Sequence, residues 1–176
     1  MTEVLVERQV ETPLADADVD QLLEDSAECR AMYRVDRHRS LLSADGRLLV
    51  CHLSSPDLES VRLALRAAGG PMPRVWACSL RDAPGLTQAE LARANVFASW
   101  QFSEPAEPEA LESIDASAAV CLRHHRVRFL RTFVSSDRRR VSSLGLAVDA
   151  ESVRLALRDA RWPVDRVWAF RQFIAQ

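Results

Sequence analysis

Three residues near position 120 have the side chains and the spacing of a transition-metal site. Cys121, His124 and His125 stand at positions i, i+3 and i+4 of a segment predicted to be helical, so all three can lie near one ion. The alternative is packing, because Cys121 and His125 fall on the apolar face of that helix and a buried cysteine behaves as a small hydrophobe. The sequence leaves both interpretations open.

The other cysteines, Cys29, Cys51 and Cys78, give weaker signals. Cys51 and His52 are neighbours in a predicted strand, so their side chains point to opposite faces and cannot share one ion. Cys78 is expected in the core. Because the first residues, MTEVLVERQV, do not resemble a secretory signal, we expect free thiols and a reducing, cytoplasmic location.

Two arginines stand within apolar rows of predicted strands. Arg39 and Arg131 alternate with aliphatic and aromatic residues, and a charge in such a row requires a partner or a wet cavity. Together with Arg37, they could bind a small anion in the space between two sheets. The alternatives are an ion pair with Glu7 or Asp36, or an edge strand that faces water.

The composition excludes several classes of function. The 176 residues contain no lysine and 5 glycines, which excludes Schiff-base chemistry, a P-loop and a glycine-rich phosphate cradle. A net charge of −2 argues against nucleic acid as a partner, and no apolar run is long enough to span a membrane. There is no HExxH motif and no nucleophile elbow, so no catalytic residue is predicted.

The chain contains an internal duplication with an offset of 92 residues. The segment VRLALR at 61–66 recurs at 153–158, and RVWA at 74–77 recurs at 166–169, without any gap. The same offset aligns Cys29 with Cys121. The two halves are therefore predicted to share one fold.

Each half has the pattern strand, helix, strand, strand, helix, strand. Strands are predicted at about 3–10, 35–42, 47–53 and 74–79, with mates at 95–102 and 166–173, and the first helices at about 15–33 and 107–125. Asp57 and Asp149 are the predicted N-caps of the second helices.

This order is the β-α-β-β-α-β motif of ferredoxin-like domains, so the fold class is α+β with two such repeats. We predict a first repeat at 1–80, a connector at 81–94 and a second repeat at 95–176. The helices cover one face of each sheet, and the other face must also be buried. We expect the two sheets to pair through that face as in a dimeric α/β barrel, with a pseudo-two-fold axis. The chain would then be a monomeric pseudo-dimer or form a homodimer.

Each repeat resembles a small bacterial domain of unknown function, the nickel-binding-protein-like domain. The resemblance rests on Val6-Glu7-Arg8, on Cys29, on the segment SLLSAD at 40–45, and on Ser55-Pro56-Asp57 before the second helix. It implies a ferredoxin-like fold that pairs as a dimer and binds a transition metal such as nickel.

The resemblance also indicates which residues could serve as metal ligands. Where such domains carry histidine, this chain has Arg39 and Arg131 in the second strands and Ala64 and Ala156 in the second helices. The remaining candidate ligands are Glu7, Cys29, Cys51, His38, His52, Cys121, His124 and His125.

Three functions are compatible with these observations. The first is a non-catalytic binding protein for a divalent transition metal or a small anion. The second is a cofactor-free enzyme of the dimeric α/β barrel type, for which His38 and His52 are the first residues to examine. The third is a protein-interaction or regulatory module, which would use the exposed Leu63 and Leu155 and the arginine-rich helix faces.

Overall fold

The computed structural model describes residues 1–162 and 164–175, with the backbone alone for 108–115. The first half of the chain contains β1 (Thr2–Gln9), α1 (Asp16–Asp25), α2 (Ala27–Met32), β2 (Asp36–Ser43), β3 (Leu48–Ser55), α3 (Leu58–Ala68) and β4 (Arg74–Asp82). The second contains α4 (Gln88–Ala92), β5 (Val96–Gln101), α5 (Pro108–His124), β6 (Arg128–Ser135), β7 (Arg140–Leu146), α6 (Ala150–Asp159) and β8 (Arg166–Ile174).

The predicted order of elements is present in both halves, with two local differences. The connector contains the short helix α4, which the sequence analysis did not predict. The helix predicted at 15–33 is divided at Ser26 into α1 and α2. The Ser26 hydroxyl donates to the Leu22 carbonyl at 2.8 Å, and such a bond competes with the backbone ladder of a helix.

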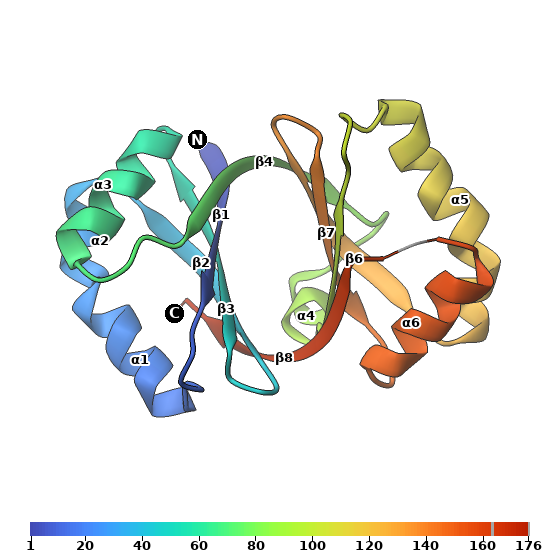
Figure 1. Cartoon of the computed structure of the whole chain (residues 1–176), viewed down its shortest axis with the longest axis horizontal. Coiled ribbons are helices and arrows are strands. Elements are labelled where there is room, and N and C mark those ends of the chain that lie inside the picture. The colour runs from blue at the N-terminus through green and yellow to red at the C-terminus, as the bar shows by residue number, and fades with distance from the viewer. Residues whose placement is uncertain (163, 176) are drawn as a thin grey trace. The chain divides into compact units, whose positions relative to one another are not determined.

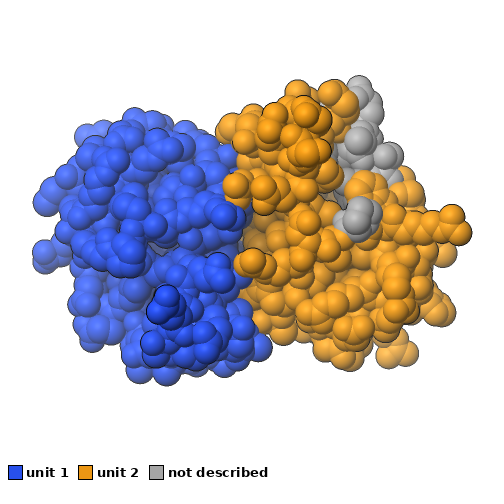
Figure 2. Space-filling view, viewed as in Figure 1, with its two compact units in different colours: residues 1–78, 171–176 blue, residues 79–170 orange. Residues whose placement is uncertain are grey.

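The chain forms two compact units, residues 1–78 with 171–176 and residues 79–170 (Figure 2). The last six residues belong to the first unit because β8 pairs with β5 in its first part and continues beside β2. Strand order is β4-β1-β3-β2-β8 in unit 1 and β8-β5-β7-β6-β4 in unit 2. This is the order of a closed antiparallel barrel of duplicated ferredoxin-like units, which confirms the predicted fold class.

In unit 1, the helices α1, α2 and α3 cover one face of the β1-β3-β2 sheet (Figure 1). Val4 and Val6 of β1 face these helices and pack with Val35, Leu53 and Val61. Since side chains alternate along a strand, the intervening odd-numbered residues of β1 point to the opposite face. Within the described residues, no helix combines the length and apolar character needed to cross a bilayer.

The β2–β3 ladder is interrupted by a β-bulge at His38. Arg37 is paired with Leu53 and Arg39 with His52, so His38 is an extra residue with no position of its own on β3. Unit 2 has the same irregularity, because Phe129 is paired with Gly145 and Arg131 with Leu144, which leaves Leu130 as the extra residue. The bulge is therefore a shared feature of the duplicated backbone.

Residues close in sequence determine where the second helix of each repeat begins and how β2 turns into β3. The carboxylates of Asp57 and Asp149 accept from the backbone N–H of Ser60 and Ser152, both at 2.7 Å, which confirms both predicted N-caps. The turn between β2 and β3 depends on Gly46, whose φ is +71°. A Cβ at Gly46 would lie 2.7 Å from the Leu14 carbonyl oxygen.

Replacing Gly46 therefore tests how tightly this turn is enclosed. Gly85 is the matched control, because its φ is +72° but a Cβ there would meet nothing within 4 Å. We expect Gly85→Ala to lower the free energy of unfolding by about 1–2 kcal/mol, the usual cost of a left-handed alanine. Gly46→Ala should lose at least about 1 kcal/mol more, because of the clash. Urea denaturation measures both, and equal losses would contradict the close contact.

Candidate metal centre

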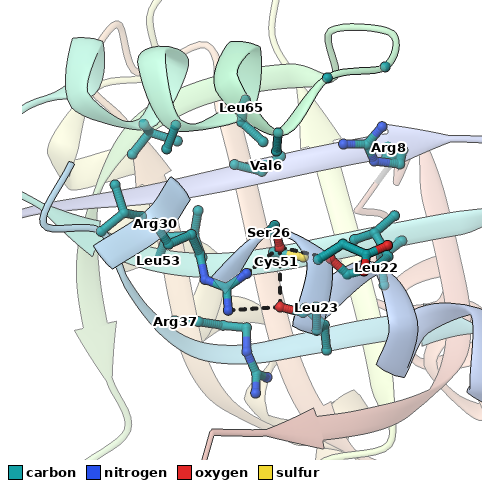
Figure 3. A pocket seen from close by; sticks show the side chains of 18 of the residues that line it. Val6, Arg8, Leu22, Leu23, Ser26, Arg30, Arg37, Cys51, Leu53 and Leu65 are labelled. Carbon is teal, nitrogen blue, oxygen red and sulfur yellow. Dashed lines mark hydrogen bonds between the residues drawn. The ribbon is translucent and has the colours of Figure 1, made fainter. Parts of the chain in front are cut away.

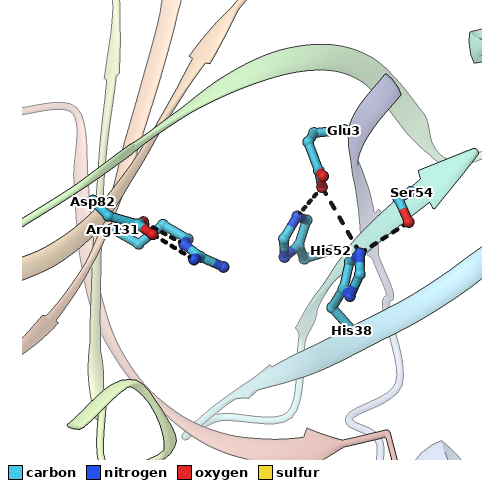
Figure 4. A network of polar contacts seen from close by, with 6 residues as sticks. All are labelled: Glu3, His38, His52, Ser54, Asp82 and Arg131. Atoms are coloured by element: carbon cyan, nitrogen blue, oxygen red, sulfur yellow. Dashed lines mark hydrogen bonds and ion pairs between the residues drawn. The ribbon is translucent and has the colours of Figure 1, made fainter. Parts of the chain in front are cut away.

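Three potential metal ligands from three strands converge on one face of the unit 1 sheet (Figure 4). They are Glu3 of β1, His38 of β2 and His52 of β3, and one ligand atom from each lies within 4.8 Å of the others. Among the residues that the structure describes, these three are the histidine, cysteine or carboxylate residues whose ligand atoms lie this close together. It lies on the face opposite helices α1, α2 and α3.

Strand register and the bulge position the three side chains. In the β1–β3 ladder, Leu5 is paired with His52 and Glu3 with Ser54, so Glu3 and His52 are diagonal neighbours on one face. Strict alternation would place His38 on the other face, toward the helices. The bulge turns it instead to the face of His52, and the two imidazole rings lie 4.7 Å apart between centroids.

The group is held by hydrogen bonds and is open to solvent on one side. His52 Nε2 lies 2.6 Å from Glu3 Oε2, and His38 Nε2 lies 3.9 Å from the same oxygen. His38 Nε2 is also 2.9 Å from the hydroxyl of Ser54. The side chain of His52 is 2% exposed, whereas those of Glu3 and His38 are 28% and 41% exposed. An ion would therefore approach from the side of His38.

Cys78 lies beside Glu3 but is not one of the three residues whose ligand atoms converge. Cys78 is paired with Glu3 in the β1–β4 ladder, and its side chain is buried. Burial, assisted by the negative charge of Glu3, raises the pKa of the Cys78 thiol to about 12. Cys78 is a core residue, as predicted.

The other predicted metal ligands of unit 1 lie away from this group. Glu7 accepts a hydrogen bond from the indole N–H of Trp76 at 2.7 Å, and it lies 3.7 Å from Arg74. Cys51 points to the helix-covered face and accepts from the Ser40 hydroxyl at 3.2 Å. Burial raises the pKa of its thiol. Cys29 lies in α2 as a free thiol.

The cysteine and histidine residues of unit 2 do not converge on a common point. Cys121 and His124 lie in the last turns of α5, and His125 is its C-cap. His125 Nε2 lies 2.7 Å from a carboxylate oxygen of Asp159, and this hydrogen bond lowers the pKa of Asp159. The His125 ring is therefore turned toward α6, and a metal site at these three residues stays a prediction from spacing.

The three arginines predicted to bind an anion occupy different environments. Arg37 points to the helix-covered face and donates to the Phe173 carbonyl at 2.7 Å, whereas Arg39 is buried on the opposite face and donates to the Gln172 side chain at 3.0 Å. Arg37 and Arg39 thus lie on opposite faces of the sheet, and an anion site that includes Arg37, Arg39 and Arg131 stays a prediction. Arg131 forms a bidentate ion pair with Asp82 at 2.6 and 2.7 Å, rather than with Glu7 or Asp36.

One member of the metal group was absent from the candidates drawn from the sequence. Glu3 is predicted from the sequence only as the first residue of the first strand. His38 had no counterpart in the second repeat and was considered as a remaining ligand and as a catalytic candidate, but not together with Glu3. The orientation of His38 depends on the β-bulge, and a bulge does not change the alternation of residue types along a strand.

The solved structures that resemble this chain are similar to it in fold. The crystal structure of a "Putative Chlorite dismutase" has 14% identity and a TM-score of 0.55, and the match covers 98% of this chain and 93% of that one. A "Putative monooxygenase" from Fusobacterium nucleatum subsp. nucleatum has 8% identity and a TM-score of 0.50, with 97% and 91% covered. No family model and no curated protein matches the sequence. The resemblance to the nickel-binding-protein-like domain therefore stays a prediction.

The ion pair of Arg131 with Asp82 gives a stability prediction. The Arg131 side chain is 13% exposed, and replacing it by methionine removes two charge-assisted hydrogen bonds. We expect Arg131→Met to lower the free energy of unfolding by about 1.5–3 kcal/mol. The control is Arg171→Met, which removes a pair with Asp16 in which both side chains are about half exposed, and it should cost less than about 1 kcal/mol. Losses of equal size in urea denaturation would show that the pair of Arg131 with Asp82 stabilises the fold no more than an exposed ion pair does.

Proposed function

We propose that the protein binds one divalent transition metal ion, such as nickel, through Glu3, His38 and His52. The observation that carries the proposal is the convergence of two imidazoles and one carboxylate within 4.8 Å, on three neighbouring strands. Nitrogen and oxygen donors of these types suit nickel, zinc, copper and iron. Strands hold their side chains more rigidly than loops do, which favours a site that needs little reorganisation.

Small movements of the side chains would complete the site. With metal–ligand distances of about 2.0–2.1 Å, two ligand atoms of a tetrahedral site lie about 3.3 Å apart. The contact of His52 with Glu3, 2.6 Å, must lengthen, and that of His38 with Glu3, 3.9 Å, must shorten. The proton between His52 and Glu3 must move to the other ring nitrogen or leave, and His38 must release Ser54. These changes are within the reach of side-chain rotation.

The second repeat provides an internal comparison. At the offset of 92 residues, Asn95, Leu130 and Leu144 take the places of Glu3, His38 and His52. Leu130 and Leu144 are fully buried, and the Asn95 side chain bonds to the backbone of Ala147. Two of the three ligands are thus replaced by aliphatic residues on the same backbone. The proposal therefore requires one metal ion per chain and not two.

Three protein ligands leave a coordination position for water or another ligand, which is also the arrangement of catalytic metal sites. A binding function and an enzymatic function would therefore use the same residues. The binding function is the one proposed, because the described structure offers a ligand set and the sequence offers no catalytic motif beside it.

The proposal predicts which variants lose metal. Native mass spectrometry and calorimetric titration of the wild-type protein with Ni²⁺ and Zn²⁺ should show one ion per chain. His38→Leu and His52→Leu, which introduce the residues of the second repeat, and Glu3→Gln should each weaken binding about 100-fold or more, because each removes a ligand. Glu7→Gln and His125→Gln are matched controls, because they remove the same groups elsewhere and should bind as the wild type does.

Two results would contradict the proposal. One is a wild-type protein that takes up no metal at millimolar Ni²⁺ or Zn²⁺. The other is binding that survives all three substitutions and is lost in Cys121→Ser or His124→Gln, which would locate the site on α5. Far-UV circular dichroism of each variant separates a lost ligand from a lost fold.

A further inference from the structure

Unit 1 contains a cavity of about 430 Å³ on the helix-covered face of its sheet (Figure 3). This is the face opposite the candidate metal centre. The walls are mainly apolar and include Val6, Leu22, Leu49, Leu53 and Leu65, from β1, α1, β3 and α3. The volume lies within the roughly 300–1,000 Å³ typical of pockets for small organic ligands.

Three arginines line this apolar cavity, and no carboxylate pairs with them among the described residues. Arg8, Arg30 and Arg37 are half-buried and hydrogen bond to neutral oxygens only. Arg8 donates to the Pro71 carbonyl at 3.3 Å, Arg37 to the Phe173 carbonyl at 2.7 Å, and Arg30 to the Ser26 hydroxyl and the Leu23 carbonyl. Fully buried charged groups are normally paired, and these three half-buried guanidinium groups share one mainly apolar cavity without a carboxylate partner.

The guanidinium groups are close enough to influence one another and the cavity floor. Burial, followed by repulsion from Arg37, lowers the pKa of Arg30. The positive charges of Arg37, Arg8 and Arg30 all act on the Cys51 thiol, although burial outweighs them and raises its pKa. In Figure 3, the Arg30 guanidinium lies next to Ser26 and Leu23 beside Cys51, whereas the guanidinium of Arg37 points away from them. An anion bound at this end of the cavity would relieve the repulsion.

The acids that line the cavity do not neutralise these arginines. Asp18 accepts from the backbone N–H of Ala15 at 2.7 Å, where it closes the N-terminus of α1. Asp25 accepts from the side chain of Gln21 at 2.7 Å. Both acids are exposed, so they stand at the mouth of the cavity rather than on its floor.

The second repeat shows what the same backbone does when the cavity residues are exchanged. The counterparts of Arg8, Arg30 and Arg37 are Trp100, Leu122 and Phe129, and that of Gly70 is Trp162. All four pack in the hydrophobic core of unit 2, where the rings of Trp100 and Phe129 meet edge to face at 5.9 Å. Unit 2 has a smaller hollow of about 290 Å³, lined by residues 81–84 at the end of β4 and after it, by α5 and by β6, and Leu122 and Phe129 are among its lining residues. Arginines in unit 1 thus stand where the duplicate has core side chains.

We propose that this cavity binds an amphipathic organic anion, in which an aliphatic or aromatic body lies against the apolar walls and a carboxylate is held by Arg30 and Arg37. Guanidinium groups bind carboxylates through charge-assisted and often bidentate hydrogen bonds, which are about twice as strong as neutral ones. The volume suits a ligand of the size of a medium-chain fatty acid. This site shares no residue with the candidate metal centre, and neither proposal depends on the other.

Calorimetric titration with decanoate tests the site, with 1-decanol and acetate as the ligands that lack the charge and the apolar body. Wild-type protein should prefer decanoate to both by about tenfold or more. Arg30→Gln and Arg37→Gln should each weaken decanoate about tenfold and leave decanol unchanged. Arg37→Phe, which introduces the residue of the second repeat, should abolish binding by filling the cavity.

The controls separate this site from other causes. Arg62→Gln removes an exposed arginine that pairs with Glu59 on α3, and Glu3→Gln changes the metal centre, so both should bind decanoate as the wild type does. Equal affinity for decanoate and decanol, or glutamine variants that bind as the wild type does, would overturn the proposal, because association would then be apolar partitioning only. Unchanged thermal unfolding of the glutamine variants would show that the cavity itself is intact.

Discussion

Residues 37–39 of β2 lie opposite only two residues of β3, Leu53 and His52, and this bulge sets which side chains each face of the unit 1 sheet presents. Without it, Arg37 and Arg39 would share a face and His38 would point the other way. With it, His38 joins His52 and Glu3, and Arg37 turns to the cavity beneath the helices. Both proposed sites therefore depend on one local departure from strand geometry, which is a common role of bulges near functional sites.

The duplication shows that the bulge belongs to the backbone and that the sites belong to the side chains. Unit 2 has the bulge at Leu130, yet its three positions equivalent to the metal group hold one amide and two buried leucines. The cavity arginines are likewise matched by Trp100, Leu122 and Phe129 in a packed core. Apolar side chains at these positions stabilise a fold by burying apolar surface, whereas the arginines and histidines of unit 1 bury less of it. Both proposed sites therefore belong to unit 1 alone.

The helices and strands that depend on interactions between residues close in sequence could be predicted from the sequence. Period-two and period-three-to-four patterns predicted the strands and most helices, and Asp57 and Asp149 predicted two helix starts, because capping involves residues only three apart. The duplication doubled these signals. The first helix is divided at Ser26, whose hydroxyl bonds to the Leu22 carbonyl, and α4 begins with a capping box of Thr87 and Glu90 within a short polar segment.

The site was harder to predict because its members come from three strands. His52 was named as a ligand, but its neighbours depend on register: Glu3 is 49 residues away and becomes a diagonal partner only when β1 pairs with β3. The role of His38 depends on the bulge, and no residue type in β2 predicts a bulge. Arg131 was recognised as a charge that needs a partner, whereas the partner itself, Asp82, follows from tertiary structure.

The most direct test of the central claim is an anomalous difference map from crystals of the wild-type protein grown with Ni²⁺, with data collected at the nickel absorption edge. The account predicts one peak per chain, about 2.0–2.1 Å from an imidazole nitrogen of His38, an imidazole nitrogen of His52 and a carboxylate oxygen of Glu3. A peak at Cys121, His124 and His125, or a map with no peak on the β1-β3-β2 sheet, would contradict it.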